Sequence, residues 1–404
     1  MKTSNQASLV PSTKGITRRD GLMLTMLGSA LLMAGCGGGG GGGTTTAGGG
    51  VAGSSATGAI TGFGSIIVGG VRFDDSTASV QDDDGANMNS GDLKLGMVVR
   101  IKGGKKTDDG SSVKAKAESI EVHSELQGPV DSKAADSIVV LGQTVKISAT
   151  TFFEDGLTLA TLALGAVVEV HGFVDPVNNN LTATRIESKP NAKSFKLQGA
   201  IKALNTATKT FTIGTVTISY LTAELPASLV LANDLVVRVR LALTPLTGTR
   251  TALKIRKFEI EKEDRDEAEV EGIITAFTST SVFSVNGLPV NASTAVFEGN
   301  KTGVVLGARV EVEGSVVNGV LVAKKVELED GEDLAKFELH GTLSLLDTTA
   351  KTFVLRGMVV NYDSATTFSV GVTALSLANG INLEVKGKRS EGNIIVATRI
   401  SLDR

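Results

Sequence analysis

The chain has 404 residues, of which 41% are hydrophobic, 21% are charged and 4% are aromatic, with 48 glycines and no tryptophan. This composition suits many short strands and turns better than one thick core, and seven prolines are too few for a disordered proline-rich chain. The formal net charge is −3, and residues 36–404 alone carry 36 basic and 42 acidic side chains, so bulk electrostatics do not favour nucleic acid as a partner.

The first 35 residues have the pattern of an export signal. Basic side chains at Lys14, Arg18 and Arg19 precede an apolar stretch over residues 21–33, which is too short to remain as a membrane span. The paired arginines of residues 17–22 also resemble a twin-arginine export motif, with glycine in place of the usual bulky apolar residue. The general secretory route and the twin-arginine route therefore both remain open.

The only cysteine, Cys36, follows this apolar stretch directly. Together with the cysteine, the preceding residues resemble a bacterial lipobox: Leu32, Met33, Ala34 and Gly35. The resemblance implies that a signal peptide of residues 1–35 is removed and that Cys36 is lipidated, although Met33 stands where the pattern prefers leucine. Because Gly37 and not aspartate follows the cysteine, it also implies the outer membrane of a Gram-negative bacterium. The alternative is a lone thiol after an ordinary signal peptide.

Residues 36–57 are rich in glycine, with seven consecutive glycines at 37–43. Such a segment has no side chains able to build a core, so we expect a flexible tether. About 19 residues of this kind have a root-mean-square reach of roughly 25 Å. The tether would give a lipid-anchored chain slack before its first folded unit.

Beyond the tether the chain repeats itself. Each unit opens with a glycine between a polar residue and an apolar strand, at Gly58, Gly128, Gly199, Gly272 and Gly341. An alternating strand follows about 35 residues later, and each unit closes with alanine three residues before Ile or Val. These three agreeing registers predict repeat 1 at 58–125, repeat 2 at 126–190, repeat 3 at 196–262, repeat 4 at 269–330 and repeat 5 at 337–404.

In each repeat apolar and polar residues alternate with a period of two, as in a sheet with one solvent-exposed face. In repeat 4, Val310 and Val312 alternate with Arg309, Glu311 and Glu313. Turn signals divide this repeat into five strand-like runs, which close most economically into a small barrel of the oligonucleotide/oligosaccharide-binding (OB) type, with a flatter β-sandwich as the competing shape. We therefore predict an all-β chain of five tandem, small, five-stranded, barrel-like (OB-like) units.

The repeats carry shared motifs that resemble a known family. Repeats 2 and 5 have Thr-x-Phe at 150–152 and 366–368 and Ala-Thr-Arg-Ile at 183–186 and 397–400, and residues 164–172 read Leu-Gly-Ala-Val-Val-Glu-Val-His-Gly. These motifs resemble the bacterial domain-of-unknown-function 5666 family over residues 58–404. Repeat 3 departs from the pattern, with Asn233 and Asp234 replacing Leu-Gly and Leu241 replacing the closing glycine. The resemblance implies an envelope location and a small β domain, and no assigned chemistry.

The three histidines are the first candidates for metal binding or proton transfer. His171 aligns with Lys102, Arg240, Glu313 and Lys386 of the other repeats, an outward position that accepts any polar group. His123 and His340 fall at other registers, so no cluster of Cys and His is predicted. We expect solvated histidines, no metal site and no cofactor.

Two acidic tracts could bind calcium. Asp82, Asp83 and Asp84 precede Gly85, and Asp108 and Asp109 precede Gly110, but the ligand spacing of an EF-hand is absent from both. Polar hairpin loops are the simpler interpretation. Residues 259–271 form a mixed-charge run that predicts a solvated linker or an extended strand, with a partner-binding hinge as the alternative.

Recognisable catalytic and stacking motifs are absent from the sequence. The alternation places Phe152, Phe211, Phe297 and Phe353 inside, so we predict no aromatic platform for nucleic acid. We find no nucleophile elbow, and the glycine tract at 37–43 lacks the lysine of a phosphate-binding loop. We expect a noncatalytic lipid-anchored envelope protein whose partners are the membrane and an unknown envelope protein or cell-wall glycan. An oligosaccharide-binding or other ligand-binding OB-like protein is the alternative.

Overall fold

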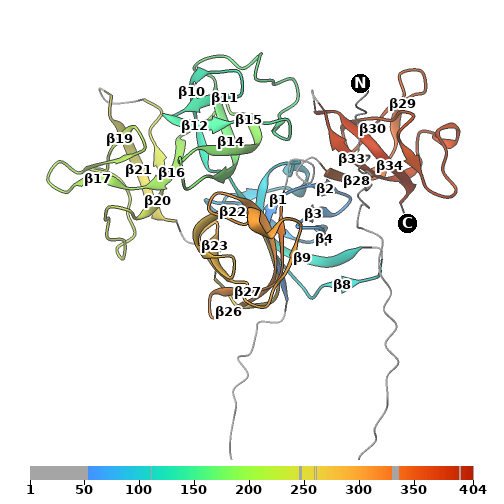
Figure 1. The fold of residues 1–404 in the computed structure, drawn as a ribbon. Helices are drawn as coiled ribbons and strands as arrows, with labels where there is room; N and C mark the ends of the chain where they lie inside the picture. The colour runs from blue at the N-terminus through green and yellow to red at the C-terminus, as the bar shows by residue number, and fades with distance from the viewer. Residues whose placement is uncertain are drawn as a thin grey trace, which may run out of the picture. The chain divides into compact units, whose positions relative to one another are not determined.

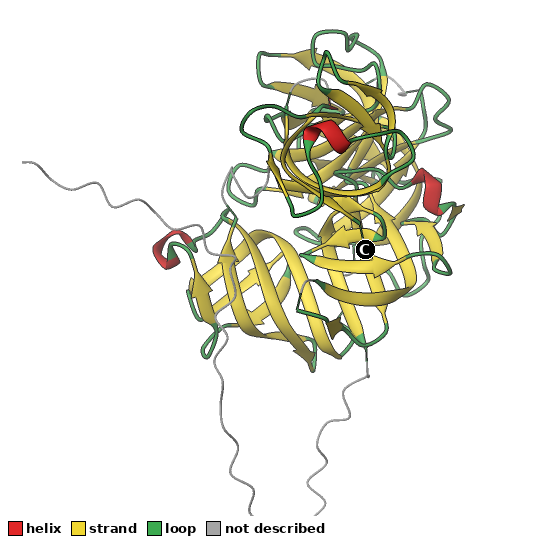
Figure 2. Ribbon diagram, turned by 90° about the vertical axis from the view of Figure 1, so that its right-hand side faces the viewer, coloured by secondary structure: helices red, strands yellow, loops and turns green. Residues whose placement is uncertain are grey.

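The computed structural model describes residues 53–110, 112–244, 248–258, 260, 262–329, 336–390 and 393–403. Within these residues strands dominate, and the helical segments are the short 3-10 turns η1 (Ser90–Asp92), η2 (Lys301–Gly303) and η3 (Ala374–Ser376), as Figure 2 shows. The predicted all-β class is confirmed. No helix of this described part combines the length and apolar character needed to span a membrane. The predicted signal peptide, the lipobox, Cys36 and most of the tether lie outside the described residues.

Repeat 4 displays the common unit most plainly, in orange in Figure 1. Its strands are β22 (Arg265–Ser279), β23 (Val282–Val285), β24 (Leu288–Asn291), β25 (Val296–Glu298), β26 (Arg309–Val317) and β27 (Val320–Leu328). Antiparallel pairs join β22 to β23, β23 to β24, β22 to β26 and β26 to β27. A parallel pair between β24 and β27 closes the ring. Five strands thus form a small barrel of the OB type.

The same ring recurs in the other repeats, with the first strand split in repeats 1, 3 and 5. Repeat 1 contains β1 (Ser54–Ala59), β2 (Gly62–Phe63), β3 (Ile66–Val68), β4 (Val71–Asp74), β5 (Ser79–Asp82), β6 (Asn87–Met88), β7 (Val98–Gly103), β8 (Thr107–Asp108) and β9 (Val113–His123). Repeat 2 contains β10 (Leu126–Lys133), β11 (Ser137–Val140), β12 (Gln143–Lys146), β13 (Phe152–Phe153), β14 (Val167–Val174) and β15 (Leu181–Ser188). In both, a parallel pair closes the barrel, β4 with β9 and β12 with β15.

Repeats 3 and 5 close in the same way, through parallel pairing of β19 with β21 and of β31 with β34. Repeat 3 contains β16 (Phe195–Ala200), β17 (Lys202–Asn205), β18 (Thr210–Ile213), β19 (Val216–Ser219), β20 (Val236–Leu241) and β21 (Arg250–Lys257). Repeat 5 contains β28 (Lys336–Thr342), β29 (Ser344–Asp347), β30 (Thr352–Leu355), β31 (Met358–Asn361), β32 (Thr367–Phe368), β33 (Asn382–Arg389) and β34 (Ile395–Leu402).

Two predicted boundaries differ from the structure. Strand β1 begins at Ser54, inside the segment assigned to the tether, and its Ala56 is fully buried. Strand β22 begins at Arg265, before the predicted start of repeat 4 at residue 269. Both additions pair within their own repeat, with β7 and with β26, and residues 54–57 of β1 also align in parallel with residues 267–270 of β22. From Arg265 onward the mixed-charge run is thus an extended strand, one of its two predicted states.

The hydrophobic core consists of three main clusters. One joins residues of repeats 1 and 5 with Phe152 of repeat 2, a second joins repeats 2 and 3, and the third belongs to repeat 4. Inward positions follow the predicted alternation, since Val310 and Val312 are fully buried. Barrels of this size have little core of their own, and sharing apolar surface between repeats increases the area removed from water.

The closing glycine of the sequence pattern marks a β-bulge between the last two strands. The register of β14 against β15 shifts between His171 and Gly172, and that of β26 against β27 shifts between Glu313 and Gly314. A Cβ atom at Gly172 would lie 2.1 Å from the carbonyl oxygen of Thr182. At Gly172 the two backbones approach too closely for a side chain, whereas repeat 3 makes the same bulge with Leu241 at this position.

Candidate functional site

Buried charged side chains gather around the end of β5, where the sequence predicted a polar hairpin loop. Asp83 is 7% exposed, and its carboxylate lies 2.7 Å from Lys196 Nζ and 2.9 Å from Arg238. Asp84 pairs with Arg240 and Arg256. The predicted polar hairpin turn is confirmed, since β5 and β6 pair on either side of it, but strands β16, β20 and β21 of repeat 3 supply cations that cover its aspartates.

These contacts hold the Asp83 carboxylate in its charged form. Burial alone would raise the pKa of Asp83, but Lys196 and Arg238 outweigh it and lower the pKa to about 2. Lys196 is itself only 2% exposed and also donates a hydrogen bond to Ser124 Oγ at 2.6 Å. The other acidic tract behaves as predicted: Asp108 and Asp109 lie in an exposed turn, where Asp109 pairs with Lys114.

All three histidines are buried, so the expectation of solvated histidines is wrong. His123, His171 and His340 are 8%, 1% and 2% exposed. His171 occupies an outward position on β14, as the alignment of repeats predicted, but neighbouring segments cover that face: its Nδ1 lies 2.6 Å from the carbonyl oxygen of His123. A side chain that points outward from its own barrel can still be buried, because the barrels pack on one another.

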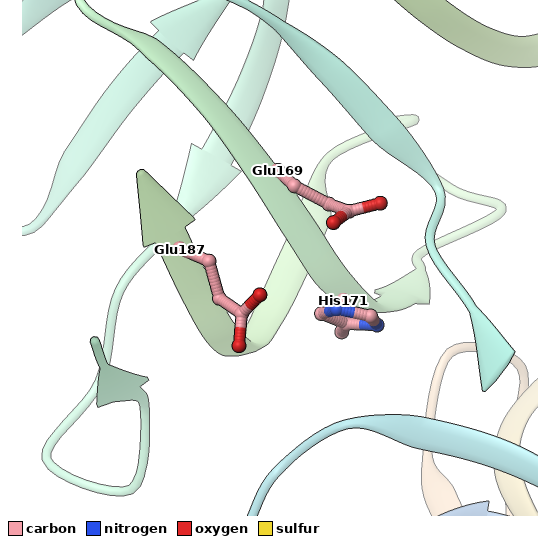
Figure 3. A group of neighbouring side chains, drawn as sticks. All are labelled: Glu169, His171 and Glu187. Carbon is pink, nitrogen blue, oxygen red and sulfur yellow. The ribbon is translucent and has the colours of Figure 1, made fainter. Parts of the chain in front are cut away.

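His171 lies beside two carboxylates (Figure 3). Glu169 and His171 are two residues apart on β14 and therefore share a face, and Glu187 on β15 is paired directly opposite Glu169. One ligand atom from each of the three side chains lies within 4.8 Å of the others. Two carboxylates and one imidazole are groups that can together hold a divalent metal ion.

Cations surround these carboxylates. Lys189 Nζ lies 3.0 Å from Glu169 and 2.8 Å from Glu187, and Arg185 lies 2.6 Å from Glu187. Burial would raise the pKa of Glu187, but Arg185 and Lys189 outweigh it and hold the pKa at about 2. Burial lowers the pKa of His171, against the opposing effect of Glu169. Ionised carboxylates and a neutral imidazole therefore coexist at neutral pH.

A second group of the same composition, Glu338, His340 and Glu384, lies in repeat 5. There His340 Nε2 lies 2.7 Å from Glu338 and Nδ1 lies 2.9 Å from Asp403. Burial would lower the pKa of His340, but the bonds to Glu338 and Asp403 raise it. Both ring nitrogens are thus engaged by carboxylates, as in a charged imidazolium ion pair.

Phenylalanine burial matches the alternation in two cases: Phe211 and Phe353 are each 1% exposed, as predicted. Phe152 is also 1% exposed, but it packs against Phe337 of repeat 5 outside its own barrel, and Phe153 faces the core of repeat 2. Phe297 is only half-buried, and Lys301 Nζ lies 4.2 Å from its ring centroid. Its strand, β25, pairs with β27 alone among the described strands, which leaves one side of the ring open to a cation.

Three segments match the family described as "Domain of unknown function (DUF5666)": residues 127–187, 271–327 and 340–401. The chain therefore contains three tandem DUF5666-like repeats. No curated protein matches the chain. Among solved structures, the chain is similar to "drosophila Unr CSD456", with 15% identity over 52% of this chain and 99% of that chain and a TM-score of 0.14. Glu169, His171 and Glu187 all lie in the first matched segment, residues 127–187.

Proposed function

We propose that this DUF5666 chain is a noncatalytic cell-envelope protein, a string of small β modules tethered to a membrane through lipid on Cys36. In this proposal the modules serve a structural role or bind a protein or cell-wall partner. The lipobox-like residues support the tether, and the packing of charged strand faces supports the interaction role.

The observation that carries the proposal is the reuse of one strand face with different charges. Strand β20 of repeat 3 has Arg238 and Arg240 at the two positions where strand β26 of repeat 4 has Glu311 and Glu313. The basic face of repeat 3 binds Asp83 and Asp84 of repeat 1. Glu313 on the acidic face of repeat 4 is only half-buried, so it can meet a basic partner in the way that the repeat 3 face meets Asp83 and Asp84.

Crosslinking in intact cells tests this proposal. We expect Cys36→Ser to release the protein from the membrane fraction, and we expect Glu313→Lys to abolish a discrete crosslinked protein or glycan that the wild type captures. Glu118→Lys is the matched control, because Glu118 is an exposed strand residue outside the acidic face of repeat 4. A membrane fraction unchanged by Cys36→Ser would reject the tether. A wild type without a specific crosslink would reject the interaction role.

A cavity favours the alternative, ligand binding. Within the unit of residues 48–404 it has a volume of about 380 Å³ and is lined by apolar side chains such as Val98, Phe173 and Leu288, with Glu125 and Arg265 among the charged ones. Such a lining suits a largely apolar molecule better than an oligosaccharide. A Val98→Trp variant would fill part of the cavity, and it should abolish binding of any apolar ligand that copurifies with the wild type.

A further inference from the structure

The Nε2 atom of His171 is a buried acceptor that the protein leaves unused. The Nδ1 atom lies 2.6 Å from a backbone carbonyl, which can only accept, so Nδ1 carries the hydrogen and Nε2 carries the lone pair. Among the described residues, no group forms a hydrogen bond with Nε2. Leaving a buried polar atom unsatisfied costs about 1–3 kcal/mol. The bond from Nδ1 to the carbonyl is also the contact that fixes the ring of a metal-bound histidine.

The space between Glu169 and Glu187 already holds a positive charge. Lys189 Nζ bonds to both carboxylates, yet the lysine side chain is 35% exposed and has a route to solvent. An ammonium group can only donate hydrogen bonds, and it does not bond to His171 Nε2. A metal ion in the same place would satisfy both carboxylates and the free imidazole nitrogen together.

We propose that Glu169, His171 and Glu187 bind a divalent transition-metal ion, with Zn²⁺ the best match, and that Lys189 moves to solvent as the ion enters. Imidazole and carboxylate together suit Zn²⁺, whereas Ca²⁺ takes six to eight oxygen ligands. Ligand atoms around a tetrahedral Zn²⁺ lie about 3.3 Å apart, so the three side chains close in from their separations of up to 4.8 Å. Three protein ligands leave a fourth position for water or for a group of a partner.

The group of the same composition in repeat 5 differs from this one in that its imidazole has no unused nitrogen atom. Glu338, His340 and Glu384 have the same chemistry, but each ring nitrogen of His340 already bonds to a carboxylate. Binding a metal there would break one of these bonds, while binding at His171 breaks none made by the imidazole. His340→Gln is therefore a control that removes a buried histidine without touching the proposed site.

Competition against a chromophoric zinc chelator tests the proposal. The full chain carries Cys36→Ser, which removes the only thiol. We expect one Zn²⁺ per chain, an affinity at least about tenfold weaker in His171→Gln and Glu187→Gln, and an affinity unchanged in His340→Gln. Lys189→Met should bind more tightly than the parent, because the competing ammonium is gone. Excess Ca²⁺ should not displace the ion.

Cobalt provides a readout that does not depend on affinity alone. Co²⁺ bound with a nitrogen and two oxygens at a four-coordinate site should give visible absorption bands that His171→Gln removes, with circular dichroism checking that the variant is folded. Zinc bound equally by the parent and by His171→Gln would overturn the proposal, as would a parent that binds no zinc. If His171→Gln does not fold, the comparison of Glu187→Gln with Lys189→Met decides: opposite changes in affinity support the site, and no change in either rejects it.

Discussion

Two glutamates on one strand face of repeat 4, Glu269 and Glu311, are buried close to other carboxyl groups. Burial raises the pKa of Glu311 to about 8, reinforced by Glu269 and other nearby carboxylates. Glu269 behaves alike, since burial raises its pKa to about 7 although Lys106 opposes the change. The fold thus disfavours the ionised form of these carboxyl groups, and Glu311 is largely protonated at neutral pH.

We predict that Glu311→Gln stabilises the protein in alkaline solution. A carboxyl whose folded pKa lies above its ordinary value of 4.5 takes up a proton on folding, so stability declines as pH rises from about 4.5 to about 8. The amide removes this dependence, and we expect a gain of roughly 1 kcal/mol or more at about pH 8, with little change at about pH 4. Urea unfolding at the two pH values measures it, with exposed Glu118→Gln as control. A loss of stability at the higher pH would contradict the prediction.

His340 should give a pH dependence of the same sign for a different reason, because here the fold stabilises the charged form of the side chain. Its folded pKa is raised by Glu338 and Asp403, so the stability that it contributes is fully present below the ordinary pKa of about 6.5 and is lost as pH rises through the folded pKa. We predict that the wild type loses more stability than His340→Gln between about pH 6 and about pH 9. Thermal midpoints across this range provide the measurement. Parallel pH profiles of the two proteins would show that the imidazolium ion pair contributes nothing.

At the end of strand β7, replacing the closing glycine, Gly103, should reduce stability more than replacing the neighbouring Gly104. A Cβ atom at Gly103 would lie 2.8 Å from the carbonyl oxygen of Lys116, whereas one at Gly104 would have open space. We predict that Gly103→Ala destabilises repeat 1 by roughly 1–3 kcal/mol and that Gly104→Ala stays within about 0.5 kcal/mol of wild type. Chemical denaturation of both variants tests this. Equal effects would mean that the bulge backbone adjusts freely.

Strand alternation and turn residues were sufficient to predict the barrels, because both are local properties. The pattern around Val310 and the recurrent closing glycine are readable without any partner strand. The candidate site is not visible in the histidine positions alone, because carboxylates and not other histidines surround His171. Glu187 meets His171 only through the register of β14 against β15, and the signal available was the Glu-x-His on one strand with a second Glu on the next.

Contacts between repeats were the least predictable feature. The partners Asp83 and Lys196 are 113 residues apart, and nothing in either local sequence specifies the other. Burial of the histidines follows from the same long-range packing. A pattern read within one repeat distinguishes inward from outward positions, but it carries no information about which outward face another repeat covers.

At the scale of the whole molecule, the Asp83 ion pairs should stabilise far more than a surface salt bridge. Removing the carboxylate leaves Lys196 and Arg238 buried without their counterion. We predict that Asp83→Ala costs roughly 3–5 kcal/mol, while Asp108→Ala in the exposed turn costs less than about 0.5 kcal/mol. Equilibrium unfolding in urea compares the two variants. A loss as small as that of Asp108→Ala would show that repeats 1 and 3 do not depend on this contact.

The parallel pairing of β1 with β22 also constrains how the chain reaches its native state. The backbone N–H of Ala59 donates to Glu271 across a separation of 212 residues, so the first strand is completed by one made much later. At a synthesis rate of about 5–20 residues per second, β1 waits roughly 10–40 seconds for its second neighbour. Closing so long a loop is slow, and the open edge can pair with another chain in the meantime. Growth temperature and expression rate should therefore affect the yield of soluble protein more strongly than its final stability suggests.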